Sequence, residues 1–450
     1  MSQSTMIRPK RKIRPKVAPE FPFTKVDVVQ ASKRLKEAAW LTDRRLKAWQ
    51  IYRDLPMPTV KDEPWRRTDI RGLPANELVI KPVDSITVDP ELRIPMVGDA
   101  DDWMLTISPG LPPTLEGDQQ LAELGIIAVD WATAVKEHDH ILKDHLGKIV
   151  SDEEGKFSAL ASAMAEHGVL LYVPPGIDVE KPLHSIFWVS GTQVAYFSRL
   201  LLVIGEGSSI TYVHETASPT SSDGYSAHAG IVEIDLAKDA KLTFIESQNL
   251  GQHVWNFTHE KAHVGPHARL EWIYGGVGSH LTKNFTEIDL IGEGAEGRMS
   301  AFYFADGVQH LDHDTQQNHL APHTTSDLLF KGALVDRSRS VWQGMIYVAP
   351  GAQQTDGYQA NRNLILSKQA RADSIPGLEI LADDVRCSHG ATVGQIEEEP
   401  IFYLMSRGLP RREAERMVVE GFFMPVLERV PLEGVRGRFQ GMIDDKLSKV

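Results

Sequence analysis

Cysteine is almost absent from this chain: Cys387 is the single one in 450 residues. One cysteine excludes an intramolecular disulfide framework and is typical of chains from a reducing compartment. It also excludes a zinc or iron–sulfur site built from cysteines of this chain alone, because such sites take about four protein ligands. Metal chemistry at Cys387 would therefore need most of its ligands from elsewhere, such as another subunit.

Positive charge is also in short supply. Lys and Arg number 48 against 61 Asp and Glu, a net charge of −13, whereas a surface that binds nucleic acid usually needs an excess of cations. No apolar run approaches the roughly 20 residues that cross a bilayer. The apolar content of 42% is normal for a globular chain. We expect a soluble protein that binds neither nucleic acid nor a membrane.

The amino-terminal segment is an exception to the acidic composition. No acidic residue precedes Glu20, and six side chains make the segment basic: Arg8, Lys10, Arg11, Lys12, Arg14 and Lys16. Two interpretations are open, a disordered tail over residues 1–20 or an organelle transit peptide. The segment is short, with few serines and with prolines near its end, which favours the tail. We expect a cytoplasmic location, with a plastid as the alternative.

The sequence motifs of nucleotide hydrolysis and acyl transfer are missing. Gly147-Lys148 and Gly155-Lys156 are both followed by the wrong residues for a G-x-x-x-x-G-K-[ST] loop, and no G-x-S-x-G elbow occurs. We therefore expect that the chain is not an enzyme.

The part of the chain before residue 168 has helical and mixed character. Residues 28–55 place apolar side chains at helical spacing and stop at Pro56, and residues 56–150 are interrupted by prolines. Residues 157–167 predict a further helix, ended by Gly168. The sequence predicts a helical and mixed amino-terminal region over residues 21–167.

From residue 168 to 394 the pattern changes to short β segments between tight turns. The turns at 205–208, 237–240, 265–268 and 292–295 recur about every 30 residues, a period that is typical of repeat architectures. The triplets Asn256–Thr258 and Asn284–Thr286 mark the same repeat, each placed before a strand. Short strands without intervening helices fit a β-solenoid or a sandwich. Apolar strands with tight corners favour the solenoid.

The carboxy-terminal region, residues 395–450, is again helical. Residues 398–407 predict a helix closed by Gly408, and Pro410 stands at the start of the next one. That second helix carries an apolar stripe at helical spacing, made of Ala414, Met417, Val418, Gly421 and Phe422. The stripe could pack on the protein body or bind a partner, and the pattern leaves both open.

Residues His259, Glu260 and His263 match the H-E-x-x-H pattern of zinc hydrolases. The chemistry requires a helix, so that both histidines share one face beside the glutamate. Strand-like residues precede the motif and Gly265-Pro266 follow it, which argues against a helix. A zinc-dependent hydrolase is kept as the alternative function.

A second polar cluster lies between Gln309 and Thr325. It contains His310, Asp312, His313, Asp314, His319 and His323. Imidazoles and carboxylates are common metal ligands, but the spacing fits no compact ligand pattern. We expect these side chains to satisfy the backbone at a corner of the solenoid.

Cys387 and His389 are the best candidates for a metal site. They are two positions apart, so on a strand their side chains point to the same face. A thiolate beside an imidazole is a reasonable start for binding iron or zinc. A buried, unreactive cysteine with a hydrogen-bonded histidine is the competing interpretation.

Several stretches resemble the SufB/SufD family of iron–sulfur cluster assembly proteins, and the SufD branch is the nearer of the two. The resemblance is carried by residues 384–394 followed by 401–408, and by residues 309–312 with His319, Pro322 and Lys331-Gly332. Residues 357–364 and Trp65–Ile70 agree as well, although Arg67 replaces the usual tyrosine of the second pattern. A SufB-like member remains the alternative within the family.

This resemblance implies a right-handed parallel β-helix core with helical regions at both ends. It implies a non-catalytic scaffold that forms a complex with a SufB-like paralogue, or a homodimer when alone, and with the ABC-type ATPase SufC. Cys387 and His389 would lie at the interface where a transient iron–sulfur cluster forms, with His389 the preferred ligand and no cofactor held by the isolated chain. SufC would bind the carboxy-terminal helices, through candidate contacts Phe402, Met417, Val418 and Phe422.

Overall fold

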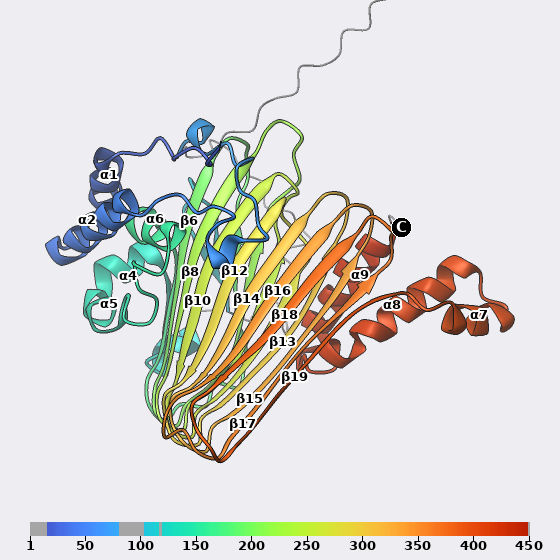
Figure 1. Cartoon of the computed structure of the whole chain (residues 1–450). Helices are drawn as coiled ribbons and strands as arrows, with labels where there is room; N and C mark the ends of the chain where they lie inside the picture. Colours follow the sequence, from blue (N-terminus) through green and yellow to red (C-terminus); the bar gives the residue numbers. More distant parts are fainter. Residues whose placement is uncertain (1–15, 81–102, 117–118, 449–450) are drawn as a thin grey trace, which may run out of the picture.

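The computed structural model describes residues 16–80, 103–116 and 119–448. Two long sheets form the walls of an elongated solenoid, and helices flank it at both ends of the chain (Figure 1). Neighbouring strands run parallel, apart from the antiparallel pairs β1–β2 and β3–β4. The predicted parallel β-solenoid with helical ends is thus confirmed. The predicted tail over residues 1–20 lies mostly outside the described residues, although Ala18 is buried.

The strands alternate between the two sheets along the chain. The ten-stranded sheet has the order β19 (Val385–Gln395), β17 (Thr355–Ile365), β15 (Thr325–Leu334), β13 (Glu296–Ala305), β11 (Arg269–Gly276), β9 (Lys241–Asn249), β7 (Ser209–Ala217), β5 (Leu183–Trp188), β1 (Met104–Ile107), β2 (Thr114–Glu116). The nine-stranded sheet has the order β18 (Arg371–Ile380), β16 (Arg339–Val348), β14 (His310–His319), β12 (Leu281–Leu290), β10 (Val254–Val264), β8 (Ser226–Leu236), β6 (Ala195–Ile204), β4 (His167–Val173), β3 (Ile127–Asp130). Because β1 pairs in parallel with β5, the sheets begin well before residue 168.

The repeat is real but its length varies. Trp255 pairs with Leu281, 26 positions further on, and Arg339 pairs with Arg371, 32 positions further on. The triplets that marked the repeat in the sequence lie inside β10 and β12 rather than before a strand. They are also out of register, because Asn284 pairs with Thr258 and not with Asn256. A shift of two keeps each side chain on the same face, so the error did not disturb the fold prediction.

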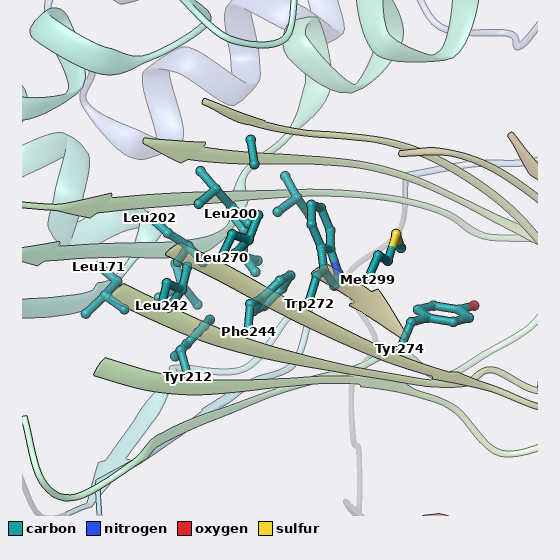
Figure 2. Close-up of a cluster of buried hydrophobic side chains, with 14 of the residues drawn as sticks. Leu171, Leu200, Leu202, Tyr212, Leu242, Phe244, Leu270, Trp272, Tyr274 and Met299 are labelled. Atoms are coloured by element: carbon teal, nitrogen blue, oxygen red, sulfur yellow. The ribbon is translucent and has the colours of Figure 1, made fainter. Parts of the chain in front are cut away.

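Rows of buried side chains, aligned from strand to strand, fill the space between the two sheets (Figure 2). In the ten-stranded sheet one such row runs through Tyr212, Phe244, Trp272 and Met299, and all four are buried. The same row continues through Leu328 to Gln359 and His389. The interior therefore changes from aromatic to polar toward the last strand.

The amino-terminal helices pack on the outer face of the nine-stranded sheet. Phe157 of α6 stacks on Phe257 of β10 with 3.8 Å between ring centroids. Helix α6 ends at Met164, and Gly168 lies in strand β4, so the predicted helix over 157–167 was too long. The other elements of this region are α1 (Lys25–Leu35), α2 (Ala39–Asp54), η1 (Glu63–Trp65), η2 (Ala75–Glu77), α3 (Gln119–Glu123), α4 (Trp131–Glu137), α5 (Asp139–His145) and α6 (Lys156–Met164).

A buried ammonium group joins this region to the core. Lys283 of β12 lies 3.0 Å from Asp312 and 2.8 Å from Asp314, both on β14, and its own side chain is fully buried. Thr68, from the segment after η1, hydrogen-bonds Asp312 and lies 2.9 Å from Nε2 of His310. Thr68 and strand β14, which are remote in the sequence, therefore contact each other on the outer face of the sheet.

The interpretation of residues 309–325 as a polar corner was wrong. Residues 310–319 form strand β14, and only His323 of the six polar side chains lies in a turn. His310, Asp312 and Asp314 point outward to the Lys283 network. His313 points inward between Tyr274 and Tyr303, with 5.3 Å to each ring centroid.

The interior also holds a pair of carboxyl groups. Glu246 of β9 and Glu260 of β10 hydrogen-bond each other across the two sheets. Glu260 also accepts hydrogen bonds from Asn284 at 2.8 Å and Thr286 at 3.2 Å. Burial, reinforced by the charge of Glu260, raises the pKa of Glu246 well above the ordinary value of 4.5. One carboxyl group of the pair is therefore protonated, because two carboxylates in contact would repel.

This pair predicts that the stability of the protein decreases as the pH rises. The raised pKa of Glu246 in the folded state means that its contribution is complete below the unfolded pKa of about 4.5 and is lost as the pH rises through the folded pKa. The free energy of unfolding, measured with urea, should fall less from pH 5.5 to pH 8.5 for Glu246→Gln than for the wild type, because the amide still donates to Glu260 without ionising. Equal losses in the two proteins would contradict this.

The carboxy-terminal helices are α7 (Glu398–Ser406), α8 (Arg411–Leu427) and α9 (Glu433–Leu447). Helices α8 and α9 cover the outer face of the ten-stranded sheet, where the ring of Phe302 lies 5.0 Å from Phe439 and 5.7 Å from Phe423. Within the described part of the chain, no helix is both long and apolar enough to span a membrane.

Candidate metal-binding site

The solenoid ends in an open layer formed by β18 and β19. Among the described strands, β19 pairs only with β17 and β18 pairs only with β16. Each strand therefore keeps one edge with backbone donors and acceptors unpaired, which is a template for binding a strand of another chain. Ile380, Leu381 and Val393 expose 38%, 51% and 47% of their surface at this end, so the open layer also offers apolar contact area.

Cys387 and His389 both lie on β19, facing the interior of the solenoid. Cys387 pairs with Gly357 and His389 pairs with Gln359 on β17. The thiol is half-buried and packs with Ile346 and its neighbours, whereas His389 is exposed. The structure thus brings the two predicted residues to one face of the last strand, as the spacing of two predicted.

Gly357 gives the thiol its position. A Cβ atom at Gly357 would lie 3.3 Å from Sγ of Cys387 and 3.3 Å from Nε2 of His319, so both groups pack closely against the glycine. Burial raises the pKa of the Cys387 thiol above its ordinary value. In the isolated chain the sulfur is therefore a protonated thiol, which is a poorer metal ligand than a thiolate.

His319 also lies at this end, although the sequence interpretation placed it in a polar corner of the solenoid. Its Nδ1 lies 2.7 Å from Oγ1 of Thr324 and its Nε2 lies 2.8 Å from Oγ of Ser326. Burial lowers its pKa to about 4, so the imidazole is neutral and can accept or donate at these hydroxyl groups. The sequence singled out His319 but not its place beside Cys387, because His319 reaches Gly357 from the opposite sheet.

These groups do not complete a metal site by themselves. In the residues that the structure describes, no three His, Cys, Asp or Glu side chains are grouped closely enough to hold an ion. A metal bound at Cys387 and His389 would therefore need further ligands. Another chain that docks on the open layer could supply them.

The H-E-x-x-H motif does not form the helical arrangement that a zinc hydrolase needs. His259, Glu260 and His263 all lie on strand β10. Glu260 points inward to Asn284, whereas His259 points outward and stacks on Phe285 at 4.8 Å. The two histidines are about 13 Å apart along a strand of four residue steps. The alternative of a zinc-dependent hydrolase at these residues is therefore wrong.

Two other stretches singled out in the sequence, residues 331–332 and 357–364, pack near the open end. A Cβ atom at Gly332 would lie 2.1 Å from the ring of Tyr303, so only glycine fits there. Asn361 donates to the Tyr303 hydroxyl at 3.2 Å, and that hydroxyl donates to Asn363 at 2.6 Å. These side chains fix the interior between His313 and the last layer.

Helix α7 projects away from the solenoid at the outer end of α8 (Figure 1). It exposes 72% of Phe402, 56% of Tyr403 and 40% of Met405. Only two residues separate it from β19, so it is adjacent in the chain to Cys387 and His389. This projecting helix is the largest exposed aromatic surface in the carboxy-terminal region of the described chain.

The stripe predicted on α8 is only partly available to a partner. Met417 is 47% exposed, but Ala414 is buried and Val418 and Phe422 are half-buried. The face that packs on the protein body is made instead by Val419, Phe423, Val426 and Leu427. The stripe predicted from the sequence, which could have packed on the body or bound a partner, is therefore rotated relative to the face that packs on the body.

Two family models match the chain. Residues 187–422 match the model described as SUF system FeS cluster assembly, SufBD core domain, and residues 29–184 match SufBD protein N-terminal region. A Bacillus subtilis protein named iron-sulfur cluster assembly protein SufB is 30% identical over 429 residues, 91% of this chain and 90% of the relative. A Staphylococcus epidermidis protein named iron-sulfur cluster assembly SufBD family protein is 28% identical over 420 residues, 90% of this chain and 89% of the relative.

Proposed function

The chain belongs to the SufBD family of iron–sulfur cluster assembly proteins, and from this we propose that it is the SufD-like scaffold subunit of a SUF complex. In this role it is not an enzyme. It forms a shared assembly interface with a SufB-like paralogue and binds a SufC-like ATPase, in the cytoplasm. The iron–sulfur cluster is the cargo, held transiently between the subunits rather than as a resident cofactor.

The observation that carries the proposal is the incomplete site on an open edge. Cys387 and His389 lie on the last strand, with one edge unpaired and exposed apolar side chains beside them. An edge strand with apolar neighbours suits pairing with a second solenoid. Such pairing would bring ligands from both chains together at β19, which is what a site with too few ligands of its own requires.

The ATPase partner is supported by a different surface. This chain has no phosphate-binding loop of its own, so ATP chemistry has to come from another subunit. The exposed aromatic face of α7 is suitable for that contact, because exposed aromatic residues dominate the binding energy of protein interfaces. The SufD-like assignment is supported by the single cysteine, since a SufB-like scaffold is expected to carry more.

The proposal is tested by co-expression of the tagged chain with the SufB-like and SufC-like proteins of the same organism. We expect both to purify with it, and the reconstituted complex to form an iron–sulfur chromophore when supplied with iron and sulfide. Purification of the chain alone under these conditions would contradict the proposal. A stable homodimer that binds the ATPase without the paralogue would favour the SufB-like alternative.

His389→Ala should lower cluster formation by that complex by on the order of tenfold or more, because losing a group around a metal costs this much affinity. The complex itself should still assemble, since His389 is exposed. His140→Ala is the matched control, because its side chain is exposed on α5 in the amino-terminal region. The chromophore, measured as absorbance per complex, should not change in the control. An unchanged His389→Ala chromophore would remove His389 from the site.

A further inference from the structure

Helix α8 contains a weak point, a segment whose residues destabilise a helix although the packing around it does not require them. Pro425 lies inside the helix, and because proline has no N–H group, the carbonyl of Gly421 loses its partner. Gly421 lies four residues earlier, and a Cβ atom built on it would meet no atom within 4 Å. Neither close packing nor an unusual backbone angle therefore requires glycine here. A glycine and a proline one turn apart make this segment the least stable part of the helix.

Lys331 contacts the helix at this point. Its Nζ atom donates to the backbone carbonyl of Phe422 at 2.6 Å and lies 4.6 Å from the centre of the Phe422 ring. Lys331 is only 5% exposed, and no carboxylate within the described residues forms an ion pair with it. Burial, together with the nearby charge of Arg362, lowers its pKa to about 8. A buried cation without a carboxylate is costly, so the helix carbonyl and the ring are its main compensation.

The two halves of α8 are attached very differently. After the weak point, Phe423, Val426 and Leu427 are buried on the sheet, and Arg429 bonds Asp327 at 2.9 Å. Before it, the outer half is tied to α7 by Arg411, which contacts Glu398 at 2.6 Å. These two parts, residues 398–420, are named here the α7–α8 arm.

The arm touches the rest of the protein loosely. Val419 is buried, Arg412 donates to the carbonyl of Ser448 at 2.8 Å, and Arg416 reaches Asp444 of α9 at 3.2 Å; the two polar contacts lie at the surface. An exposed ion pair of this kind contributes little. A cavity of about 210 Å³ remains between the arm and α9, lined in part by Arg412, Val419 and Leu447. The angle of the arm is therefore set mainly where Lys331 meets Phe422.

We propose that α8 hinges at Gly421 and Phe422, where Pro425 leaves the Gly421 carbonyl without its helical partner, and that Lys331 is the positioning residue that holds the α7–α8 arm at one angle to the solenoid. The inference rests on the proposed function in one respect: the arm carries the aromatic face assigned to the ATPase. Breaking the Lys331 contact frees the arm, so the orientation of that face is coupled to one buried ammonium group. The sequence motif Lys331-Gly332 then has two separate uses, because Lys331 positions the arm and Gly332 makes room for Tyr303.

The hinge is tested in the full-length chain without any partner, so that its failure is separate from failure of the proposed function. Hydrogen exchange is followed by mass spectrometry in Lys331→Met, which keeps the aliphatic stem, and in Lys241→Met, an exposed lysine of the same sheet. Loss of the charged hydrogen bond should speed exchange in residues 398–425 by about tenfold or more. Exchange in α9 and the strands should not change, and Lys331→Arg should restore the slow rate.

Gly421→Ala is the opposing variant. Because nothing occupies the space of its Cβ, alanine should fit and slow exchange in the same residues by about fivefold. Spin labels at Glu399→Cys and Lys238→Cys, in a Cys387→Ser background, should give a narrow distance distribution that Lys331→Met broadens. Unchanged exchange and distances in Lys331→Met would overturn the hinge. Faster exchange throughout the protein would also overturn it, because Lys331 would then be a general stabilising residue. Failure of the wild type to bind the ATPase would count against the proposed function alone.

Discussion

Lys283→Met should destabilise the protein by about 3–5 kcal/mol, the usual cost of removing one partner from a buried ion pair. Lys283 and Asp312 are both fully buried, and Asp314 shares the same ammonium group. Methionine fills much of the same volume but leaves two carboxyl groups without a cation. Burial and the neighbouring Asp312 charge already raise the pKa of Asp314 to about 7, so protonation would offset only part of the loss. Urea unfolding monitored by circular dichroism measures the change.

The control for Lys283 is Lys238→Met; the Lys238 side chain is 53% exposed, and its Nζ lies 3.8 Å from Glu206 and 3.6 Å from Asp239. Surface pairs contribute about 0–1 kcal/mol, so this variant should remain close to the wild type. Adding Asp312→Asn to Lys283→Met should recover part of the stability, since it removes one uncompensated charge. Because Thr68 bonds Asp312, the single variant should also make residues 60–75 easier to cleave by protease. Equal stability of the Lys283 and Lys238 variants would contradict a structural role for the network.

Phe402→Ala/Tyr403→Ala should weaken ATPase binding by at least about thirtyfold, which corresponds to one interface hot spot of about 2 kcal/mol. Both side chains are mostly exposed in the isolated chain, at 72% and 56%. Their truncation should therefore leave the unfolding free energy nearly unchanged. Titration calorimetry with the purified SufC-like protein measures the affinity, and urea unfolding measures the stability.

A matched pair of exposed apolar residues separates a specific contact from general surface hydrophobicity. Ile291 and Leu320 are 45% and 43% exposed at successive corners of the solenoid, far along the chain from α7. Ile291→Ala/Leu320→Ala should bind the ATPase like the wild type. If the two double variants lose equal affinity, or neither loses any, α7 is not the docking helix.

The solenoid was predictable because its signal is local. Turns at about 30-residue intervals and strands without intervening helices are visible in one chain, and the final strand carried Cys387 and His389 on one face. Helix ends were less predictable. Residues 165–167 contain no helix breaker, yet His167 begins β4 because pairing with β6 outweighs helix propensity there.

Contacts between remote positions could not be predicted. Lys283 meets Asp312, and Asp312 meets Thr68, only because the register places β12 beside β14 under the amino-terminal segment. His319 reaches Gly357 from the opposite sheet, and Glu246 meets Glu260 across the interior. The sequence alone does not distinguish a polar strand residue that faces solvent from one that faces a buried partner. The unexpected parts of the site all depend on this distinction.

The open layer of β18 and β19 has a thermodynamic consequence. In a repeat protein each layer is stabilised by its intrinsic folding and by its nearest neighbours, and this layer has a neighbour on one side only. It should therefore fray more readily than any interior layer, as the last turn of an isolated helix does. A second solenoid that docks on this layer would supply the stabilising contacts of the missing neighbour. Docking and local ordering would then occur together, as one cooperative event. The two candidate metal ligands on this layer, Cys387 and His389, would then acquire a fixed geometry at the moment the complex forms.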